Sequence, residues 1–160
     1  MTSASPPLPL SRRLGVAPPS RIAPHTFVLS LSAEERGRLR GHRRSDCGRD
    51  LLLQLPRGEA LDPGEWLAQE DGVALVRVVP AAEELLVVGS ERPLELLRAA
   101  YHLGNRHVPL EVRSDQLRLL VDPVLERLLL HRGLEVRRVV EPFLPEPGAY
   151  GAAPHAHTHP

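Results

Sequence analysis

Histidine is the residue whose number and spacing most clearly suggest chemistry in this sequence. Three of the eight histidines alternate with other residues at the end of the chain: His155, His157 and His159. Imidazole suits nickel, zinc and copper, and a flexible His-x-His-x-His segment can wrap around a metal with little strain. The alternatives are a remnant or an accidental histidine-rich end. We expect residues 151–160 to form a flexible metal-binding tail, although the affinity order alone would favour copper over nickel.

Two further histidines, His102 and His107, lie on either side of a Gly-Asn-Arg turn in the second half of the chain. His102 falls in the last turn of an expected helix, where a protonated imidazole complements the helix dipole. His107 is expected to open the strand that follows, and a lone strand histidine is more often structural than a ligand. The spacing raises the odds of a metal site only modestly and leaves open whether His102 is a ligand. The remaining histidines fit structural or surface roles: His25, His42 and His131.

Other classes of function find little support in the composition. Cys47 is the single cysteine, so one chain can form no disulfide and no Cys-x-x-Cys metal site, which fits a reducing cytoplasm. The sequence has no Gly-rich phosphate loop and no paired-carboxylate arrangement, so we expect no enzymatic activity. The formal net charge is zero, which argues against nucleic acid as a partner. No apolar run approaches the roughly 20 residues of a membrane-spanning helix, so no membrane partner is expected.

The first half of the chain predicts a small β-domain. Residues 1–24 are rich in Ser, Pro and Arg and predict a disordered extension. Strands are expected at 25–31, 50–55 and 73–79, separated by turns that contain Pro and Gly, so residues 25–84 predict an N-terminal β-domain. A basic run between the first two strands indicates either a solvated loop or a docking patch for an acidic partner. It comprises Arg36, Arg38, Arg40, Arg43 and Arg44.

The second half of the chain predicts two helices between short strands. Pro93 opens a helix that extends to residue 103 and carries apolar side chains at helical spacing: Leu94, Leu97 and Tyr101. Asp122 is the expected N-cap of a second helix, which ends at Gly133. The expected buried face of this helix comprises Leu125, Leu128 and Leu129. Apolar residues predict the strands at 85–89, 108–112, 117–121 and 134–140.

The resulting order, β-α-β-β-α-β, is that of a ferredoxin-like fold. The predicted fold class is α+β, with the small all-β domain followed by a ferredoxin-like domain at residues 85–150. Two helices would cover one face of the sheet and leave the other face for a partner or a second copy. An RNA-binding module of this fold needs aromatic residues on its central strands, and Phe27 and Phe143 lie outside them.

One segment closely resembles the core motif of the urease accessory protein E family. This segment runs from Tyr101 to His107 and reads Tyr-His-Leu-Gly-Asn-Arg-His. Two shorter pieces resemble the family in the same order: Leu55-Pro56-Arg57-Gly58 in the β-domain, and Pro147-Gly148-Ala149-Tyr150 before the histidine tail. The resemblance extends from about His25 to the end of the chain, and its His-Leu-Gly-Asn-Arg-His stretch is highly specific.

The resemblance implies a non-enzymatic nickel carrier, with nickel as cargo and zinc or copper as competitors. It implies a cytoplasmic homodimer that shares nickel through His107 of both chains, with further nickel bound by the tail histidines. Apo-urease and other urease accessory proteins, including a GTPase, are the implied partners. Some members carry two more histidines at the positions of Val121 and Pro123, so those auxiliary sites are absent here.

A general nickel or zinc buffer without a dedicated client is the alternative function. Loss of such a buffer would affect metal tolerance broadly, whereas loss of a dedicated carrier would affect urease alone. The sequence itself does not decide between these two functions.

Overall fold

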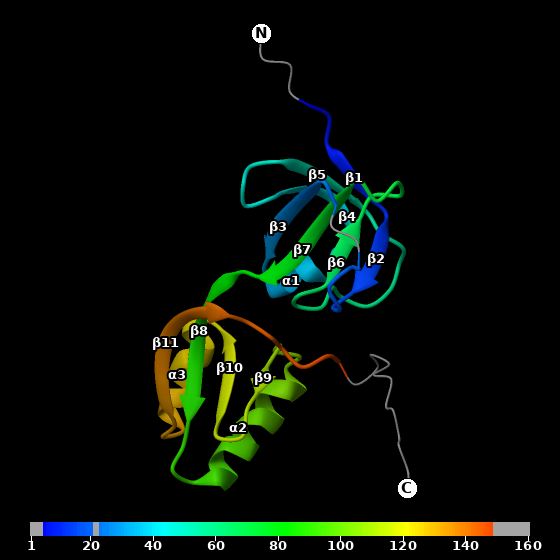
Figure 1. Cartoon of the computed structure of the whole chain (residues 1–160). Coiled ribbons are helices and arrows are strands. Elements are labelled where there is room, and N and C mark those ends of the chain that lie inside the picture. Colours follow the sequence, from blue (N-terminus) through cyan, green and yellow to red (C-terminus); the bar gives the residue numbers. More distant parts are fainter. Residues whose placement is uncertain (1–4, 21–22, 149–160) are drawn as a thin grey trace, which may run out of the picture. The chain divides into compact units, whose positions relative to one another are not determined.

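The computed structural model describes residues 5–20 and 23–148 of the chain (Figure 1). The chain divides into two compact units. Unit 1 comprises Met1–Leu85 and Arg138–Leu144, and unit 2 comprises Leu86–Arg137 and Pro145–Pro160. Most of the strands lie in unit 1, whereas both longer helices lie in unit 2. The expected α+β fold class is therefore confirmed.

The N-terminal segment of unit 1 contains strands. β1 (Leu8–Leu10) pairs in parallel with β5 (Asp50–Gln54), and β2 (Arg12–Gly15) joins the second sheet of the unit. The expected disorder of residues 1–24 is therefore wrong for these strands. The prediction rested on the Ser, Pro and Arg content of the segment and overlooked its few apolar side chains. One of them, Leu10, is completely buried in the core and anchors the segment.

Unit 1 contains a three-stranded and a four-stranded sheet. The first has the order β1-β5-β4, with β4 (Arg40–Arg44) at its edge. The second has the order β2-β6-β7-β3, in which β6 (Trp66–Ala68), β7 (Ala74–Pro80) and β3 (His25–Leu31) follow β2. β3 and β7 pair in parallel along their whole length. The three strands expected in this region are confirmed to within one residue at each end.

Leucine and valine side chains from both sheets form the core of unit 1, because alternate residues of a strand point to the same face. This core comprises Leu10, Leu29, Leu31, Leu39, Leu51, Leu53, Leu55, Leu61, Leu67, Val76 and Val78. Glu65 is also buried, and its carboxylate accepts hydrogen bonds from Arg13 Nε at 2.6 Å and from the N–H of Asp62 at 2.9 Å. The hydrogen bond to the Glu65 carboxylate raises the pKa of the Arg13 guanidinium above its ordinary value.

The basic run of unit 1 belongs to a helix and a strand. Ser32 caps α1 (Ala33–Arg36) and forms a capping box with Glu35. Arg36, the last residue of α1, is buried and donates hydrogen bonds to the carbonyl oxygens of Leu31 at 3.2 Å and Phe143 at 2.8 Å. The solvated-loop interpretation therefore holds only for Arg38, which is exposed between α1 and β4, because Arg36 is a buried structural residue and the other three arginines lie on β4.

Residues 82–142 have the β-α-β-β-α-β order of the expected ferredoxin-like fold (Figure 1). The elements are β8 (Ala82–Gly89), α2 (Pro93–Asn105), β9 (Glu111–Val112), β10 (Gln116–Leu120), α3 (Pro123–His131) and β11 (Glu135–Pro142). The strand order in the sheet is β11-β8-β10-β9. β9 begins at Glu111, three residues later than expected. Residues 108–110 do not belong to the strand, and one of them, Pro109, has no N–H to donate to a neighbouring strand.

Helix α3 begins as the sequence predicts. The carboxylate of Asp122 accepts hydrogen bonds from the N–H groups of Val124 at 2.7 Å and Leu125 at 3.0 Å. Leu129 is completely buried and Leu125 packs against the core, as expected, whereas Leu128, the third residue expected on this face, is half-buried and lies outside the core cluster. The core of unit 2 comprises Leu86, Val88, Leu96, Ala99, Leu103, Leu110, Leu117, Leu119, Leu129 and Leu134. No helix among the described residues is long and apolar enough to cross a membrane.

Candidate metal centre

Helix α2 carries two sets of apolar side chains on different faces. Leu96, Ala99 and Leu103 are buried and attach the helix to the core of unit 2. The set whose spacing predicted the helix lies on the other face and is exposed to solvent. Leu94 is 56% exposed, and Leu97 and Tyr101 are each 67% exposed. The structure therefore places an apolar stripe on the outside of α2, and we call these three residues the α2 stripe.

The C-terminus of α2 is closed by a Schellman motif. The N–H of His107 donates to the carbonyl oxygen of Gly104 at 2.9 Å, and the N–H of Val108 donates to that of Leu103 at 3.1 Å. This motif requires a left-handed residue after the helix, a position that glycine usually occupies. Here the residue is His107, with φ of 56°, and it is the only non-glycine residue with positive φ in the described part of the chain.

The left-handed conformation determines how His107 is presented. The residue lies in the turn, not in a strand as expected, because β9 begins only at Glu111. Its side chain is exposed, while Val108 and Leu103 on either side of the motif pack into the core. A side chain other than glycine in this conformation costs roughly 1–2 kcal/mol, although histidine is among the residues that are enriched there. The fold thus holds an exposed imidazole on a hydrogen-bonded, mildly strained turn.

His102 lies in the last turn of α2, as predicted from the sequence. Its ring is half-buried and meets the ring of Tyr101 edge-on, with 5.5 Å between the centroids. The described residues contain no group of three or more His, Cys, Asp or Glu side chains that could hold a metal ion. His107 is therefore not surrounded by a complete ligand set from the described part of its own chain. A site at His107 needs further ligands from elsewhere.

The other expected ligands, His155, His157 and His159, lie outside the described residues. His25 is exposed and stacks on Phe27 with 6.5 Å between the ring centroids, which fits the surface role expected for it. His42 lies exposed on the edge strand β4, and His131 is the last residue of α3, near the helix C-terminus. Cys47 is exposed, and a hydrogen bond with the Ser45 hydroxyl, 3.3 Å from its sulfur, lowers the pKa of the thiol.

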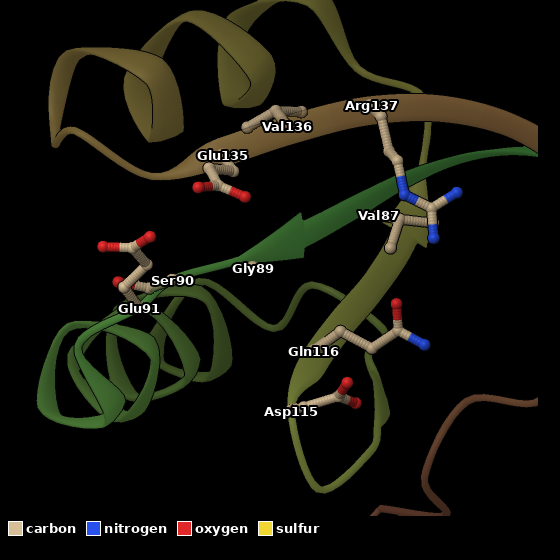
Figure 2. Close-up of a pocket in the computed structure, with 9 residues that line it drawn as sticks. All are labelled: Val87, Gly89, Ser90, Glu91, Asp115, Gln116, Glu135, Val136 and Arg137. Atoms are coloured by element: carbon tan, nitrogen blue, oxygen red, sulfur yellow. The ribbon is translucent and has the colours of Figure 1, made fainter.

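A hollow of about 460 Å³ lies at the ends of β8, β10 and β11, and the sequence had given no sign of it. Figure 2 shows Glu91 and Glu135 on one side of the hollow and Asp115 with Gln116 on another. Arg137 also lines the hollow, and Val87 and Val136 provide the apolar part of the lining. The hollow contains no histidine. It is distinct from the turn that carries His107.

Comparison with known proteins gives consistent matches along nearly the whole chain. Residues 10–80 match the family model described as UreE urease accessory protein, N-terminal domain, and residues 83–160 match the model of the C-terminal domain. A protein named urease accessory protein UreE from Synechococcus sp. (strain CC9311) is 56% identical over 128 residues, which cover 80% of this chain and 83% of the relative.

Two further relatives carry the same name. The protein from Thermosynechococcus vestitus is 54% identical over 129 residues, which cover 81% of this chain and 87% of the relative. The protein from Nostoc punctiforme is 46% identical over 140 residues, which cover 88% of this chain and 95% of the relative. The identity extends across both units, and the relatives match the chain over most of their own length.

Proposed function

Because the chain belongs to the UreE urease accessory protein family, we propose that it is a nickel carrier that donates nickel to the urease metallocentre. Membership of the family gives it a role in urease maturation and makes it an accessory protein, not an enzyme. The observation that carries the nickel proposal is the exposed imidazole of His107. That imidazole sits on a left-handed turn, where the residue type best suited to the backbone would be glycine.

The conformation of His107 favours a functional role over a structural one. A histidine with a purely structural role is expected to be buried or hydrogen-bonded, whereas the side chain of His107 is exposed. Strained backbone residues cluster at functional sites, where the strain positions a reacting or ligating group. Neutral imidazole is a good nickel ligand, and imidazolium is not a ligand. Nickel binding should therefore weaken in acid, where the imidazole is protonated.

One imidazole cannot retain a metal ion, so the site requires more than one source of ligands. We infer that His107 from two chains holds the nickel ion at a two-fold axis, where symmetry brings equivalent residues together. The α2 stripe supports this inference, because Leu94, Leu97 and Tyr101 are exposed on the same helix that ends at the His107 turn. An exposed apolar surface is characteristic of an interface. A homodimer would bury it beside the paired imidazoles.

The tail histidines His155, His157 and His159 would supply further ligands. Ligand exchange between the tail, the shared site and the client protein would allow nickel to move without ever being released as a free ion. Zinc and copper would compete for the same imidazoles, since all three metals accept nitrogen ligands. The proposed partners are apo-urease and other urease accessory proteins, including a GTPase, and the proposed location is the cytoplasm.

A calorimetric nickel titration of the wild type and His107→Asn tests the site. Asparagine tolerates the left-handed conformation, so this variant removes the imidazole while the turn is preserved. We expect the tightest nickel site to disappear and urease activation at limiting nickel to fall, with an unchanged thermal unfolding midpoint. Unaltered nickel binding by His107→Asn would show that His107 is not the shared ligand.

A deletion of the gene separates the dedicated carrier from a general metal buffer. A dedicated carrier predicts that urease activity falls while tolerance of nickel and zinc stays normal. A buffer predicts the opposite pattern, with reduced metal tolerance and normal urease activity. Complementation with His107→Asn should fail to restore urease activity if the shared site is required.

A further inference from the structure

Helix α3 of unit 2 carries a second hollow on its exposed side. Its volume is about 590 Å³, and it is lined by Val124, Arg127, Leu128, His131 and Arg132. Val124, Leu128 and His131 lie four and three residues apart, so their side chains follow one another along one face of the helix. The opposite side of α3 packs on the core of unit 2. We call this hollow the α3 groove.

The floor of the α3 groove is apolar. Val124 is 60% exposed, and Leu128 is half-buried. Neither side chain belongs to the core cluster of unit 2 or packs against it, so neither holds the helix in place. Exposed apolar surface with a polar rim is characteristic of interaction sites. A molecule that covers this floor would therefore remove apolar surface from water without disturbing the core.

Every ionisable side chain that lines the α3 groove is basic. No ion pair joins Arg127, His131 or Arg132 to another residue in the described part of the chain. Arg127 Nε donates to the carbonyl oxygen of Pro123 at 3.3 Å, which leaves the two terminal nitrogens of its guanidinium for a partner. Glu126, the nearest acidic residue in the sequence, does not line the groove. The groove therefore presents uncompensated positive charge around its apolar floor, and an acidic occupant complements it.

The backbone of α3 determines which form the occupant takes. The N–H of Arg132 closes the last turn by donating to the carbonyl oxygens of Leu128 and Leu129, at 3.2 Å each. The side of such a helix offers no backbone donor or acceptor to an extended chain, unlike the edge of a sheet. An occupant must therefore satisfy its own backbone hydrogen bonds, and an amphipathic helix does so.

Two other kinds of occupant suit the α3 groove less well. Two copies of the chain that met here about a two-fold axis would bring Arg127 and Arg132 against the same residues of the other copy, and like charges repel. Nucleic acid would contact the arginines through its phosphate groups, but it would leave Val124 and Leu128 without an apolar partner. The occupant that satisfies both the charge and the floor has acidic and apolar side chains together.

We propose that the α3 groove binds an acidic amphipathic helix of a partner protein. The apolar face of that helix packs over Val124 and Leu128, as the ridges of one helix pack into the grooves of another. Its carboxylates accept from the guanidinium groups of Arg127 and Arg132, which are suited to paired hydrogen bonds with a carboxylate. This binding uses none of the proposed nickel ligands and does not depend on the nickel site.

Fluorescence anisotropy with the metal-free full-length protein tests the proposal. The probe is a labelled peptide of about 18 residues, because shorter isolated helices are marginal, with Leu along one helical face and Glu beside it. We expect saturable binding that weakens with salt. The double variant Arg127→Gln/Arg132→Gln should weaken binding by about tenfold or more. Arg12→Gln/Arg57→Gln removes the same charge from exposed positions in unit 1 and should leave binding unchanged.

Two further comparisons separate recognition of a helix from simple charge attraction. A peptide of the same composition with its Leu residues scattered around the helix keeps the charge but has no apolar face, so binding should be lost. Val124→Glu should also abolish binding of the original peptide, whereas Leu130→Glu adds the same charge at a similarly exposed position of α3 outside the groove and should bind it like the wild type. An unchanged thermal unfolding midpoint checks that both variants fold.

A reversal of charge makes the test specific to the groove. Arg127→Glu/Arg132→Glu should bind a peptide with Lys in place of Glu and should no longer bind the original peptide. The proposal would be overturned by equal binding of the scattered peptide, by wild-type affinity in Val124→Glu, or by a wild type that shows no saturable binding. Displacement of the peptide by a short DNA duplex would identify a phosphate-binding surface instead and would also overturn it.

Discussion

The N–H of His107 lies 2.9 Å from the carbonyl oxygen of Gly104, and this hydrogen bond holds a histidine in a backbone conformation that glycine prefers. The exposed imidazole and the strained turn therefore belong to the same residue. Stability and the proposed metal binding make opposite demands at this position. Glycine suits the backbone best but has no side chain that could bind a metal, whereas histidine, the proposed ligand, strains the backbone.

This conflict predicts how variants of His107 should rank in stability. His107→Gly should unfold with a free energy about 1 kcal/mol larger than that of His107→Ala, because alanine retains the left-handed strain and glycine relieves it. Both variants should lose the tightest nickel site. Urea unfolding monitored by circular dichroism provides the first comparison, and calorimetry provides the second. Equal stability of the two variants would show that the turn has relaxed and imposes no strain.

The α2 stripe predicts a variant that separates the subunits. Leu97 is 67% exposed in a single chain, so Leu97→Glu should leave the fold intact and place a charge in the proposed dimer interface. We expect light scattering to report a monomer and nickel affinity to fall together with the mass. Leu130→Glu is the matched control, because Leu130 is 52% exposed on α3, outside the stripe. Dimers of wild-type strength in Leu97→Glu would place the interface elsewhere.

Two arginines of the basic run should behave very differently when they are replaced. Arg36 is buried and donates to the carbonyl oxygens of Leu31 and Phe143, so Arg36→Ala removes the donor to Phe143, while the Leu31 oxygen still accepts from the N–H of Ala81. We expect a loss of about 2–3 kcal/mol in the free energy of unfolding. Arg38 is exposed and pairs with Glu34, so Arg38→Ala should change stability by about 0.5 kcal/mol or less. Denaturant unfolding of both variants checks this ranking.

The order of the helices and strands could be predicted from the sequence because each element carries its own local signal. Pro93 and Asp122 mark the helix starts, and alternating apolar residues mark the strands. Residues 8–15 were missed because the apolar signal of Leu8 and Leu10 is too short to stand out among prolines and arginines. Their burial depends on β5, which lies about forty residues further along the chain.

The candidate site could be found from its motif, but its geometry could not. The spacing of Leu94, Leu97 and Tyr101 identified a helix without showing which face is buried, because Leu96, Ala99 and Leu103 have similar spacing. The left-handed turn could not be predicted, because histidine and not glycine occupies the position with positive φ. Local sequence patterns report the conformation that a residue prefers. The structure reports the conformation that its neighbours impose.

Removal of the tail tests the division of nickel between the shared site and the tail. Truncation after Tyr150 deletes His155, His157 and His159 and leaves His107, with His102 nearby in sequence, as the candidate ligands. Nickel commonly takes about four to six ligands, so one chain cannot saturate it. Two chains double the supply of imidazole, and water can fill the remaining positions. We therefore expect a dimer that keeps about one nickel ion per two chains, with lower affinity than the full-length protein and lower total capacity.

Calorimetry and light scattering on the truncated protein should be read together, because stoichiometry alone cannot distinguish a shared site from a half-active sample. A full-length variant with serine in place of the three tail histidines controls for chain length and should match the truncated protein. A truncated monomer that binds one nickel ion per chain would contradict the shared site, because a second copy would then be unnecessary. Complete loss of binding would place the whole metal site in the tail, and His107 would then need another explanation for its strained and exposed position.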